Sequence, residues 1–441
     1  GAYFVGTAAG GTQLYVAGLL DTTSGADTAA LYFVKYDAAT YAPLDTFIYS
    51  ATHLYAGMFG GAVVTSDDGL AAVVNYLSGS GSLRMLITKF AADGTVEFAL
   101  EDSLAAGPNE EAHGIMEAIN GSDLIVYGTA DTTAGGTNRQ AFWARIDTAA
   151  GGSIENFYMF GSPSNTEMFE DAIITADNNY LFAGGQDAAT DNLYIVKTGT
   201  NGASIFSQTR NQSGNDEWAY SLAEQADGRI VLAGKAGSAA VLDIATSAGL
   251  NVFTKTFAGS GSESSFNDLL QTADGGLLAV GFDVDGVDSN NFWAYYQFLD
   301  LVLDSSFNPT CADSATGQAY FSVVGGTAPY TYTYNGTPVG GIDSTALAAG
   351  TYSVVVMDAD GQTDTVEFTL TDPDAVVVDS LVQMAENDCY GESLASFRVY
   401  ASGGSGEFKY AIDGGAFTAD SIFTGLAAGT YYISVLDSLN G

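Results

Sequence analysis

A short pattern recurs six times in the first three hundred residues, and it restricts the fold more than any other feature of the sequence. In five of the six copies an apolar run ends at glycine, and successive copies start 47 to 56 residues apart. Repeats of this length indicate one architectural unit copied along a chain. The runs are LYVAG (14–18), LAAVV (70–74), LIVYG (124–128), YLFAG (180–184), IVLAG (230–234) and LLAVG (277–281).

Each copy reads as four short strands. A turn rich in Asp, Asn and Gly precedes the run, and a second apolar segment such as LYIVKTG (193–199) follows it. Another turn and a fourth strand complete the unit. Because so small a sheet cannot bury either face alone, the pattern predicts radial stacking of the sheets. We therefore expect an all-β fold with a β-propeller over 1–307, with six blades, or seven if one lies upstream of residue 1.

A different repeat occupies the C-terminal third of the chain. The hexapeptide LAAGTY occurs at 347–352 and at 426–431, and the surrounding residues align as well. Alternating strands such as TYSVVVMD predict two tandem immunoglobulin-like β-sandwiches, over 308–374 and 375–441. The second copy lacks the last strand, which QTDTVEFTLTDP (362–373) forms in the first. This difference predicts that the natural chain continues past Gly441.

The C-terminal repeat resembles the SprB-type adhesin repeat in its pattern GG-T-x-PY-x-Y, followed by L-x-AGTY-x-V-x-V-x-D-x-x-G. The resemblance covers 310–441 and implies immunoglobulin-like modules of long Bacteroidota surface proteins, which the type IX system exports. Such proteins take part in gliding, attachment and contact between cells. The six-copy unit likewise resembles the propeller repeats of large secreted bacterial surface proteins. The C-terminal pattern is carried by Gly325, Gly326, Pro329, Tyr330, Gly350 and Tyr352 in the first copy and by Gly403, Gly404, Gly429 and Tyr431 in the second.

The charge balance of the chain is extreme. It has 52 acidic and 12 basic residues, and its net charge is −40. Such a surface repels nucleic acids and anionic membranes, so we expect neither as a partner. No stretch reaches the roughly 18 apolar residues that cross a bilayer, which predicts no membrane insertion in this segment. A saline medium would screen the carboxylates, so we expect a secreted, extracellular protein; an acidic cytosolic protein is the alternative.

The sequence contains none of the motifs that signal common catalytic sites. It lacks HExxH, GxSxG, a P-loop and CxxC, and its two histidines, His53 and His113, fall in different copies of the repeat. We interpret both as residues of loops or sheet edges. A sialidase-like propeller would need an arginine cluster, and this chain has six arginines, of which Arg398 lies outside the propeller region. We therefore predict that the chain is not an enzyme.

Two acidic turns are candidates for calcium, the one cofactor that the sequence suggests. Hard cations use carboxylates at alternate positions around a glycine turn. Neither turn has the downstream Glu of an EF-hand, and DADG is also an ordinary hairpin turn. The candidate ligands are Asp283, Asp285 and Asp288 in DVDGVD and Asp358, Asp360 and Asp364 in DADGQTD.

Two further patterns have competing interpretations. Asp followed by Ser or Thr resembles the O-glycan acceptor pattern of exported Bacteroidota proteins, but turns rich in Thr and Asp give the same dipeptides. The acceptors would include Thr22, Ser103, Ser344 and Ser421.

A basic residue also recurs at one place of the repeat, as Lys35, Lys89, Arg145 and Lys197, until Asp243 breaks the series. A ring of cations would bind an anion; we favour strand residues whose heads meet neighbouring acids.

Copied modules with no catalytic motif are typical of proteins that attach to a surface or span the distance between two surfaces. We expect a non-enzymatic extracellular adhesin, or a structural segment of a cell-surface appendage, that mediates attachment or contact between cells. Its partners would be glycans or proteins of another surface, and self-association into a homo-oligomer or filament would add weak contacts along the chain. The alternative is a carbohydrate-binding or carbohydrate-active propeller with immunoglobulin-like spacers. Aromatic residues and paired acids at the propeller axis would favour that alternative.

Overall fold

A computed structural model gives the fold. It describes residues 2–7, 11, 13–21, 29–50, 58–102, 109–131, 138–149, 151–162, 164–187, 191–211, 216–273, 275–286, 288–310, 314–404 and 406–438. These residues form strands, turns and connections, and they contain no helix. A helix able to cross a membrane is accordingly absent from the described part of the chain. The expected all-β fold is confirmed.

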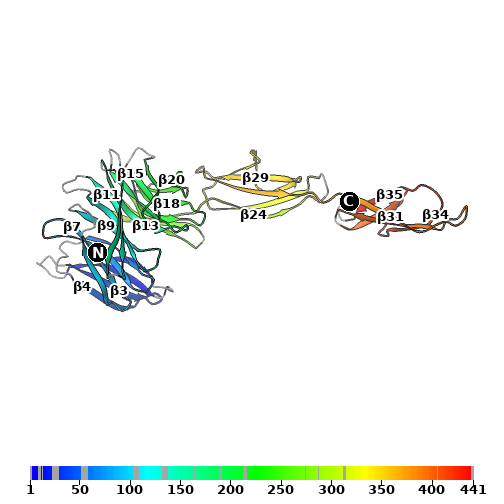
Figure 1. The fold of residues 1–441 in the computed structure, drawn as a ribbon. Coiled ribbons are helices and arrows are strands. Elements are labelled where there is room, and N and C mark those ends of the chain that lie inside the picture. Colours follow the sequence, from blue (N-terminus) through cyan, green and yellow to red (C-terminus); the bar gives the residue numbers. More distant parts are fainter. Residues whose placement is uncertain are drawn as a thin grey trace. The chain divides into compact units, whose positions relative to one another are not determined.

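The first of two compact units ends at Tyr296 and consists of six antiparallel sheets (Figure 1). In every sheet the strands pair in chain order, because each connection is a short turn that returns the chain beside itself. The first three sheets contain β1 (Ala2–Thr7), β2 (Gln13–Asp21), β3 (Ala29–Asp37) and β4 (Pro43–Ser50); β5 (Met58–Val64), β6 (Leu70–Leu77), β7 (Leu83–Phe90) and β8 (Val96–Asp102); and β9 (Glu110–Glu117), β10 (Leu124–Asp131), β11 (Arg139–Asp147) and β12 (Ser153–Phe160).

The next two sheets have the same four-stranded form, whereas the last has three strands. They contain β13 (Thr166–Ile174), β14 (Tyr180–Asp187), β15 (Asn192–Thr198) and β16 (Ser204–Arg210); β17 (Glu217–Glu224), β18 (Ile230–Ala236), β19 (Ala239–Ala245) and β20 (Asn251–Phe257); and β21 (Glu263–Gln271), β22 (Leu277–Asp285) and β23 (Asp288–Tyr296). Five of the six copies of the repeat therefore form the predicted four strands.

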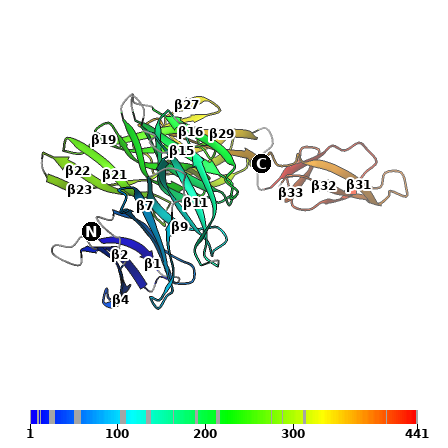
Figure 2. The same ribbon diagram turned by 60° about the vertical axis from the view of Figure 1, so that its left-hand side comes forward.

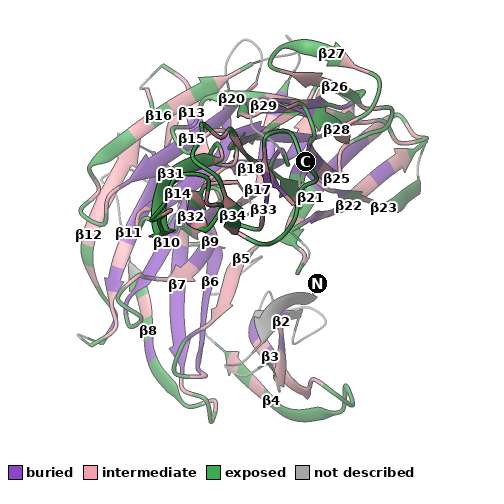
Figure 3. Cartoon of the chain, turned by 90° about the vertical axis from the view of Figure 1, so that its right-hand side faces the viewer, coloured by how far each residue is buried: buried purple, intermediate pink, exposed green. Residues whose placement is uncertain are grey.

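Neighbouring sheets pack face to face through the apolar runs. The second and third sheets share a core that includes Val73 and Val126, and the fourth and fifth share one that includes Ile195 and Leu232. The first strand of each sheet, which we call the inner strand, contacts the inner strand of the next sheet. Figure 3 shows buried residues concentrated in the middle strands and exposed residues on the fourth. This stacking follows from the repeat, because both faces of a middle strand are apolar.

The six sheets stay separate hydrogen-bonded sheets and do not close into a ring among the described residues. The outer face of the last sheet is uncovered: Trp293 is 67% exposed, and Leu270, Val280 and Tyr295 are exposed as well. A hollow of about 590 Å³ on this sheet is lined by residues that include Leu278 and Phe292. The predicted closed propeller is thus represented by its blade-like sheets but not by a closed ring.

The first unit ends earlier than the sequence predicted. The sequence analysis placed the propeller over 1–307, a range that includes 300–307. The corresponding strand β24 (Asp300–Phe307) instead pairs along its whole length with β25 (Gly317–Val324), and the second compact unit begins at Gln297. Its alternating leucines suit the edge of any half-buried sheet, so the sequence pattern alone does not determine the partner of this strand.

The first C-terminal module has two sheets over one core. One sheet orders β24, β25 and β28 (Ser344–Leu347), and the other orders β27 (Thr337–Val339), β26 (Thr331–Tyr334), β29 (Gly350–Met357) and β30 (Thr363–Leu370). The core between them includes Leu301, Phe321, Val354 and Phe368. Such two-sheet packing fits the predicted sandwich, whereas the immunoglobulin-like assignment itself stays a prediction.

The second module repeats this order with fewer strands, of which Figure 2 labels β31, β32 and β33. One sheet orders β31 (Val377–Ala385), β32 (Ala395–Ser402) and β34 (Ile422–Leu426), and the other pairs β33 (Phe408–Ile412) with β35 (Ile433–Asp437). These strands correspond in order to β24, β25, β28, β26 and β29. No described strand corresponds to β30.

Candidate functional site

The inner strands share an irregularity that the apolar pattern does not reveal. At the same place in every sheet, two inner-strand residues stand opposite one residue of the second strand, which defines a β-bulge. A bulge breaks the two-residue alternation and redirects one side chain. The extra residues are, from the first sheet to the last, Val5, Gly60, His113, Glu170, Tyr220 and Asn267.

Three polar side chains of adjacent sheets meet beside the bulges, and Tyr220 at the bulge of the fifth sheet lies within electrostatic range of Glu170; we call His113, Glu170, Trp218 and Tyr220 the bulge site. The Nδ1 atom of His113 lies 2.8 Å from Oε2 of Glu170 and joins the third sheet to the fourth. Trp218 of the fifth sheet donates from Nε1 to the other Glu170 oxygen at 3.2 Å. The side chains of His113 and Glu170 are 15% and 22% exposed, so the pair is recessed but reachable.

The electrostatics of the bulge site favour a charged histidine. Burial lowers the pKa of His113, but the hydrogen bond that it donates to Glu170 and the negative charge of that carboxylate outweigh burial and raise the pKa overall. Burial raises the pKa of Tyr220 against the opposing positive charge of Lys235, and the carboxylates of Glu170, Glu263 and Asp191 act in the same direction as burial. Its hydroxyl therefore stays protonated at neutral pH and can donate a hydrogen bond.

A second acidic residue, next in sequence to Glu170, links the inner strands beside the bulge site. Asp171 follows the bulge of the fourth sheet and accepts hydrogen bonds from the Ser221 hydroxyl at 3.0 Å and the Leu222 amide at 2.9 Å. Burial raises its pKa to about 6 against the opposing effect of these donors. Oδ1 of Asp268 in the sixth sheet lies 3.4 Å from the same hydroxyl oxygen and is the alternative acceptor of its one hydrogen. Three inner strands are thereby linked through polar contacts as well as apolar packing.

The sequence analysis missed this site. We interpreted His113 as a residue of a loop or sheet edge, and it lies on β9, the edge strand of its sheet, but its place at a bulge beside Glu170 was not foreseen; His53 lies outside the described residues. A usable signal was present, because HG, ED and YS interrupt the alternation at matching places of the third, fourth and fifth copies. Reading it required the strand register, which one sequence does not give.

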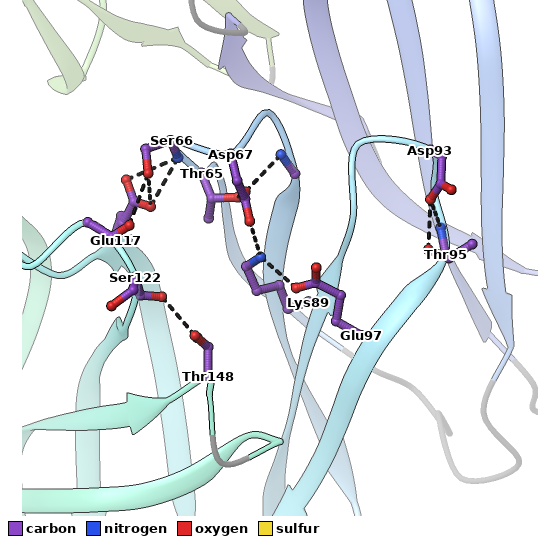
Figure 4. Close-up of polar contacts among 12 residues, drawn as sticks. Thr65, Ser66, Asp67, Lys89, Asp93, Thr95, Glu97, Glu117, Ser122 and Thr148 are labelled. Carbon is purple, nitrogen blue, oxygen red and sulfur yellow. Dashed lines mark hydrogen bonds and ion pairs between the residues drawn. The ribbon is translucent and has the colours of Figure 1, made fainter.

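The recurring cations form ion pairs within their own sheets. Figure 4 shows Nζ of Lys89 between Asp67 and Glu97, at 2.6 Å from a carboxylate oxygen of each. Arg145 pairs with Asp123 at 2.7 Å and Lys197 with Asp177 at 2.8 Å. The favoured interpretation is confirmed for these three residues. In the fifth sheet the charges are exchanged, because Asp243 meets Arg210 of the preceding sheet at 2.7 Å.

The calcium candidates do not come together. Among the described residues, no group of three or more acidic, histidine or cysteine side chains could hold a metal ion. The carboxylate of Asp283 accepts hydrogen bonds from Ser260, Gly261 and Ser264, while that of Asp358 accepts from Thr327 and Gln362. Both fasten turns. Asp364 accepts the amide of Leu301 at 2.7 Å, and Asp285 pairs with Asp288 across a hairpin. Calcium binding stays a prediction.

The tyrosine of the repeated LAAGTY motif makes the same hydrogen bond to a backbone carbonyl in both modules. The hydroxyl of Tyr352 donates to the carbonyl of Ala348 at 2.9 Å, and that of Tyr431 donates to Ala427 at 2.8 Å. The hydroxyl of Tyr330 likewise bonds the carbonyl of Gly325 at 2.7 Å.

The glycine pairs of the two modules are equivalent as well. Gly325, Gly326, Gly403 and Gly404 all have positive φ angles between 52° and 85°. A Cβ atom on Gly325 or Gly403 would lie 2.1 Å from a backbone oxygen, so only glycine fits. The remaining motif residues, Pro329, Gly350 and Gly429, occupy loop or strand-end positions.

Two of the four glycan acceptors lie in the described part of the chain. Ser344 begins β28 and is half-buried, and Ser421 is a half-buried residue whose carbonyl accepts the amide of Val399 at 2.9 Å. Thr22 and Ser103 lie outside the described residues. Neither described acceptor is on an exposed loop tip, and modification at these positions stays a prediction.

Comparison with known proteins leaves the family open. No protein-family model matches the sequence, and no curated protein matches it. Among solved structures, a protein of unknown function from Dyadobacter fermentans has a TM-score of 0.44 at 10% identity, over 67% of this chain and 93% of that one. The Dos1 propeller has a TM-score of 0.38 at 11% identity, over 65% and 76%. The β-propeller domain of the Trilobed protease from Pyrococcus furiosus has a TM-score of 0.36 at 10% identity, over 84% and 98%.

Proposed function

We propose that this chain is a non-enzymatic extracellular attachment protein, in which a β-propeller binds a carbohydrate at the bulge site. The single observation that carries the proposal is the set of inner-strand bulges that gathers His113, Glu170, Trp218 and Tyr220. Hydroxyl groups of a sugar need donors and acceptors at fixed positions, which the carboxylate, imidazole and phenol supply. The apolar face of a sugar ring packs on aromatic rings, which Trp218 and Tyr220 supply.

The charge of the chain narrows the ligand class. Twelve basic residues stand against 52 acidic ones, so a neutral polyhydroxylated ligand is favoured over a phosphate or sulfate ester. This choice joins the expected adhesin with its carbohydrate-binding alternative, because a surface protein can attach through glycans.

The C-terminal modules would act as spacers. We propose that they are immunoglobulin-like repeats of the SprB type, on chains that the type IX system exports. Their common strand order and the equivalent Tyr352 and Tyr431 hydrogen bonds support a shared origin. A tyrosine that bonds the backbone a few residues upstream also occurs in immunoglobulin folds.

A glycan array with two matched variants tests the carbohydrate proposal. Glu170→Gln keeps the size of the side chain but weakens its hydrogen bonds, and we expect it to lower glycan affinity about tenfold or more. Glu101→Gln removes the same charge from the exposed end of β8 and should bind like the wild-type chain. Binding that is equal in all three proteins, or absent from the wild-type chain, would contradict the proposal.

Hydrolysis of a bound glycan would overturn the non-enzymatic part. Incubation of each positive glycan with the wild-type chain, followed by mass spectrometry of the sugar, should return it intact. Release of shorter products that depends on Glu170 would instead make the chain carbohydrate-active.

A further inference from the structure

We propose that the bulge site recognises an N-acetylated sugar by its acetamido group. This group combines a carbonyl oxygen, an amide hydrogen and a methyl group, and each of these has a counterpart among the side chains of the site. The inference rests on the proposed carbohydrate function, and it adds the chemical feature by which the site would choose one sugar over another.

Two polar atoms of the bulge site are free to meet a ligand. Nδ1 of His113 lies against Glu170 at 2.8 Å, whereas Nε2 has no hydrogen-bond partner among the described residues. The Tyr220 hydroxyl likewise has no partner in the part of the chain that the structure describes. Both residues are half-buried and neither atom is fully enclosed, so a ligand can reach the two atoms from solvent.

Both free atoms act as donors. The Tyr220 phenol keeps its hydrogen at neutral pH, and the carboxylate of Glu170 beside Nδ1 favours the imidazolium form of His113, in which Nε2 also carries a hydrogen. Two donors suit a strong acceptor that has no hydrogen of its own to place. A carbonyl or carboxylate oxygen of the ligand is therefore preferred to a hydroxyl group.

The charges around the site decide between these two acceptors. Arg139 and Lys235 act electrostatically on the two donors, but both cations are already paired. Arg139 binds Glu111 at 2.8 Å, and Lys235 binds Glu263 at 3.2 Å. Because the chain as a whole carries a net charge of −40, a neutral carbonyl is favoured over the carboxylate of an acidic sugar.

Glu170 supplies the counterpart of the amide hydrogen. One of its oxygens lies against Nδ1 of His113 and the other accepts from Nε1 of Trp218, so the carboxylate is held in place from two neighbouring sheets. A carboxylate has about four acceptor positions, and two contacts leave room for an amide of the ligand.

Trp218 supplies the apolar counterpart. Its ring packs on the second strand of the fourth sheet, where a Cβ atom on Gly185 would lie 2.3 Å from a ring carbon. This contact fixes the ring against β14, while the residue stays half-buried. Its accessible part can pack on the acetamido methyl group or on the apolar face of the sugar ring.

Matched pairs of glycans, arrayed and probed with the whole 441-residue chain, test the inference. The members of a pair differ only in an acetamido group in place of one hydroxyl group, as chitotriose and cellotriose do at each sugar. We expect the acetamido member to bind at least about tenfold more tightly, because a hydroxyl group cannot accept from both donors as a carbonyl does.

The outcomes separate this inference from the proposed function. Equal or tighter binding of the hydroxyl members would overturn the acetamido inference and leave carbohydrate binding intact. Tighter binding of glycans that carry a carboxylate in place of the acetamido group would do the same. If no member of any pair binds, the proposed function fails, and the inference fails with it.

Removal of one hydroxyl group supplies a matched pair of variants. Tyr220→Phe deletes the free donor and keeps the ring, so the preference for the acetamido member should fall about fivefold. Tyr400→Phe removes a hydroxyl group from an exposed tyrosine of the second compact unit and should keep the preference of the wild-type chain. A preference that Tyr220→Phe leaves unchanged, or that both variants reduce equally, would overturn the inference.

Discussion

Trp143 and Trp293 hold the same place in the third and sixth copies of the repeat, yet the first is fully buried and the second is 67% exposed. Each faces the equivalent residue of its second strand, Tyr127 in one sheet and Val280 in the other. The difference lies in the neighbour, because Tyr180 and Phe182 of the fourth sheet contact the ring of Trp143. A repeat thus specifies the side chain at a position, whereas the adjacent copy decides how far that side chain is buried.

The largest effect should come from the covered tryptophan. Trp143→Ala would remove a large buried ring between two sheets and should lower the free energy of unfolding by about 3–5 kcal/mol. Chemical denaturation followed by circular dichroism measures the loss. A loss below about 1 kcal/mol would mean that the third and fourth sheets are not packed as described.

A buried carboxylate should make the covered interfaces sensitive to pH. The folded-state pKa of Asp171 is raised to about 6, above its ordinary 3.8. Its stabilising contribution is therefore complete below about pH 4 and is lost as pH rises through 6. Relative to an Asp171→Asn variant, the wild-type chain should lose up to about 3 kcal/mol of stability between pH 4 and 7. Denaturation of both proteins at several pH values gives the difference, and a pH-independent difference would contradict the expectation.

A carboxylate at a solvent-exposed turn should behave differently. The hydrogen bond from Lys197 lowers the pKa of Asp177 to about 2, so this group stays ionised from pH 4 to 7. Because its side chain is 56% exposed, Asp177→Asn should cost less than about 1 kcal/mol, and the cost should shrink in high salt. Parallel denaturation with and without salt measures it. A cost like that of a buried pair would show that the turn is covered in solution.

The smallest effect should come from the uncovered tryptophan. Trp293→Ala should change the free energy of unfolding by no more than about 0.5 kcal/mol, as for other surface substitutions. Iodide quenching, compared between the wild-type chain and this variant, should identify Trp293 as accessible. A cost similar to that of Trp143→Ala would break the comparison, because it would mean that another sheet covers this face and closes the ring.

The features that could be predicted from the sequence are those that several copies of a repeat encode. Six apolar runs and their turns predicted the sheets, and two LAAGTY motifs predicted two equivalent modules. The partner of β24 could not be predicted, because Leu301 and Leu303 alternate equally well on any sheet edge. The bulge site was missed because His113 and Glu170 are 57 residues apart and meet only through the strand register. Asp283 and Asp358 were ambiguous because a carboxylate beside a turn can bind either a cation or the amides of the turn.

The internal use of the basic residues has a consequence for the whole molecule. At least eight of the twelve lysines and arginines form ion pairs with carboxylates of the same chain. The acids that remain give the exterior the character of a polyanion with few fixed counterions. Two such surfaces repel over a range that shrinks from about 8 Å at 0.15 M salt to about 3 Å at 1 M. The salinity of the medium would therefore set how closely neighbouring copies can approach, as it does in a polyelectrolyte brush.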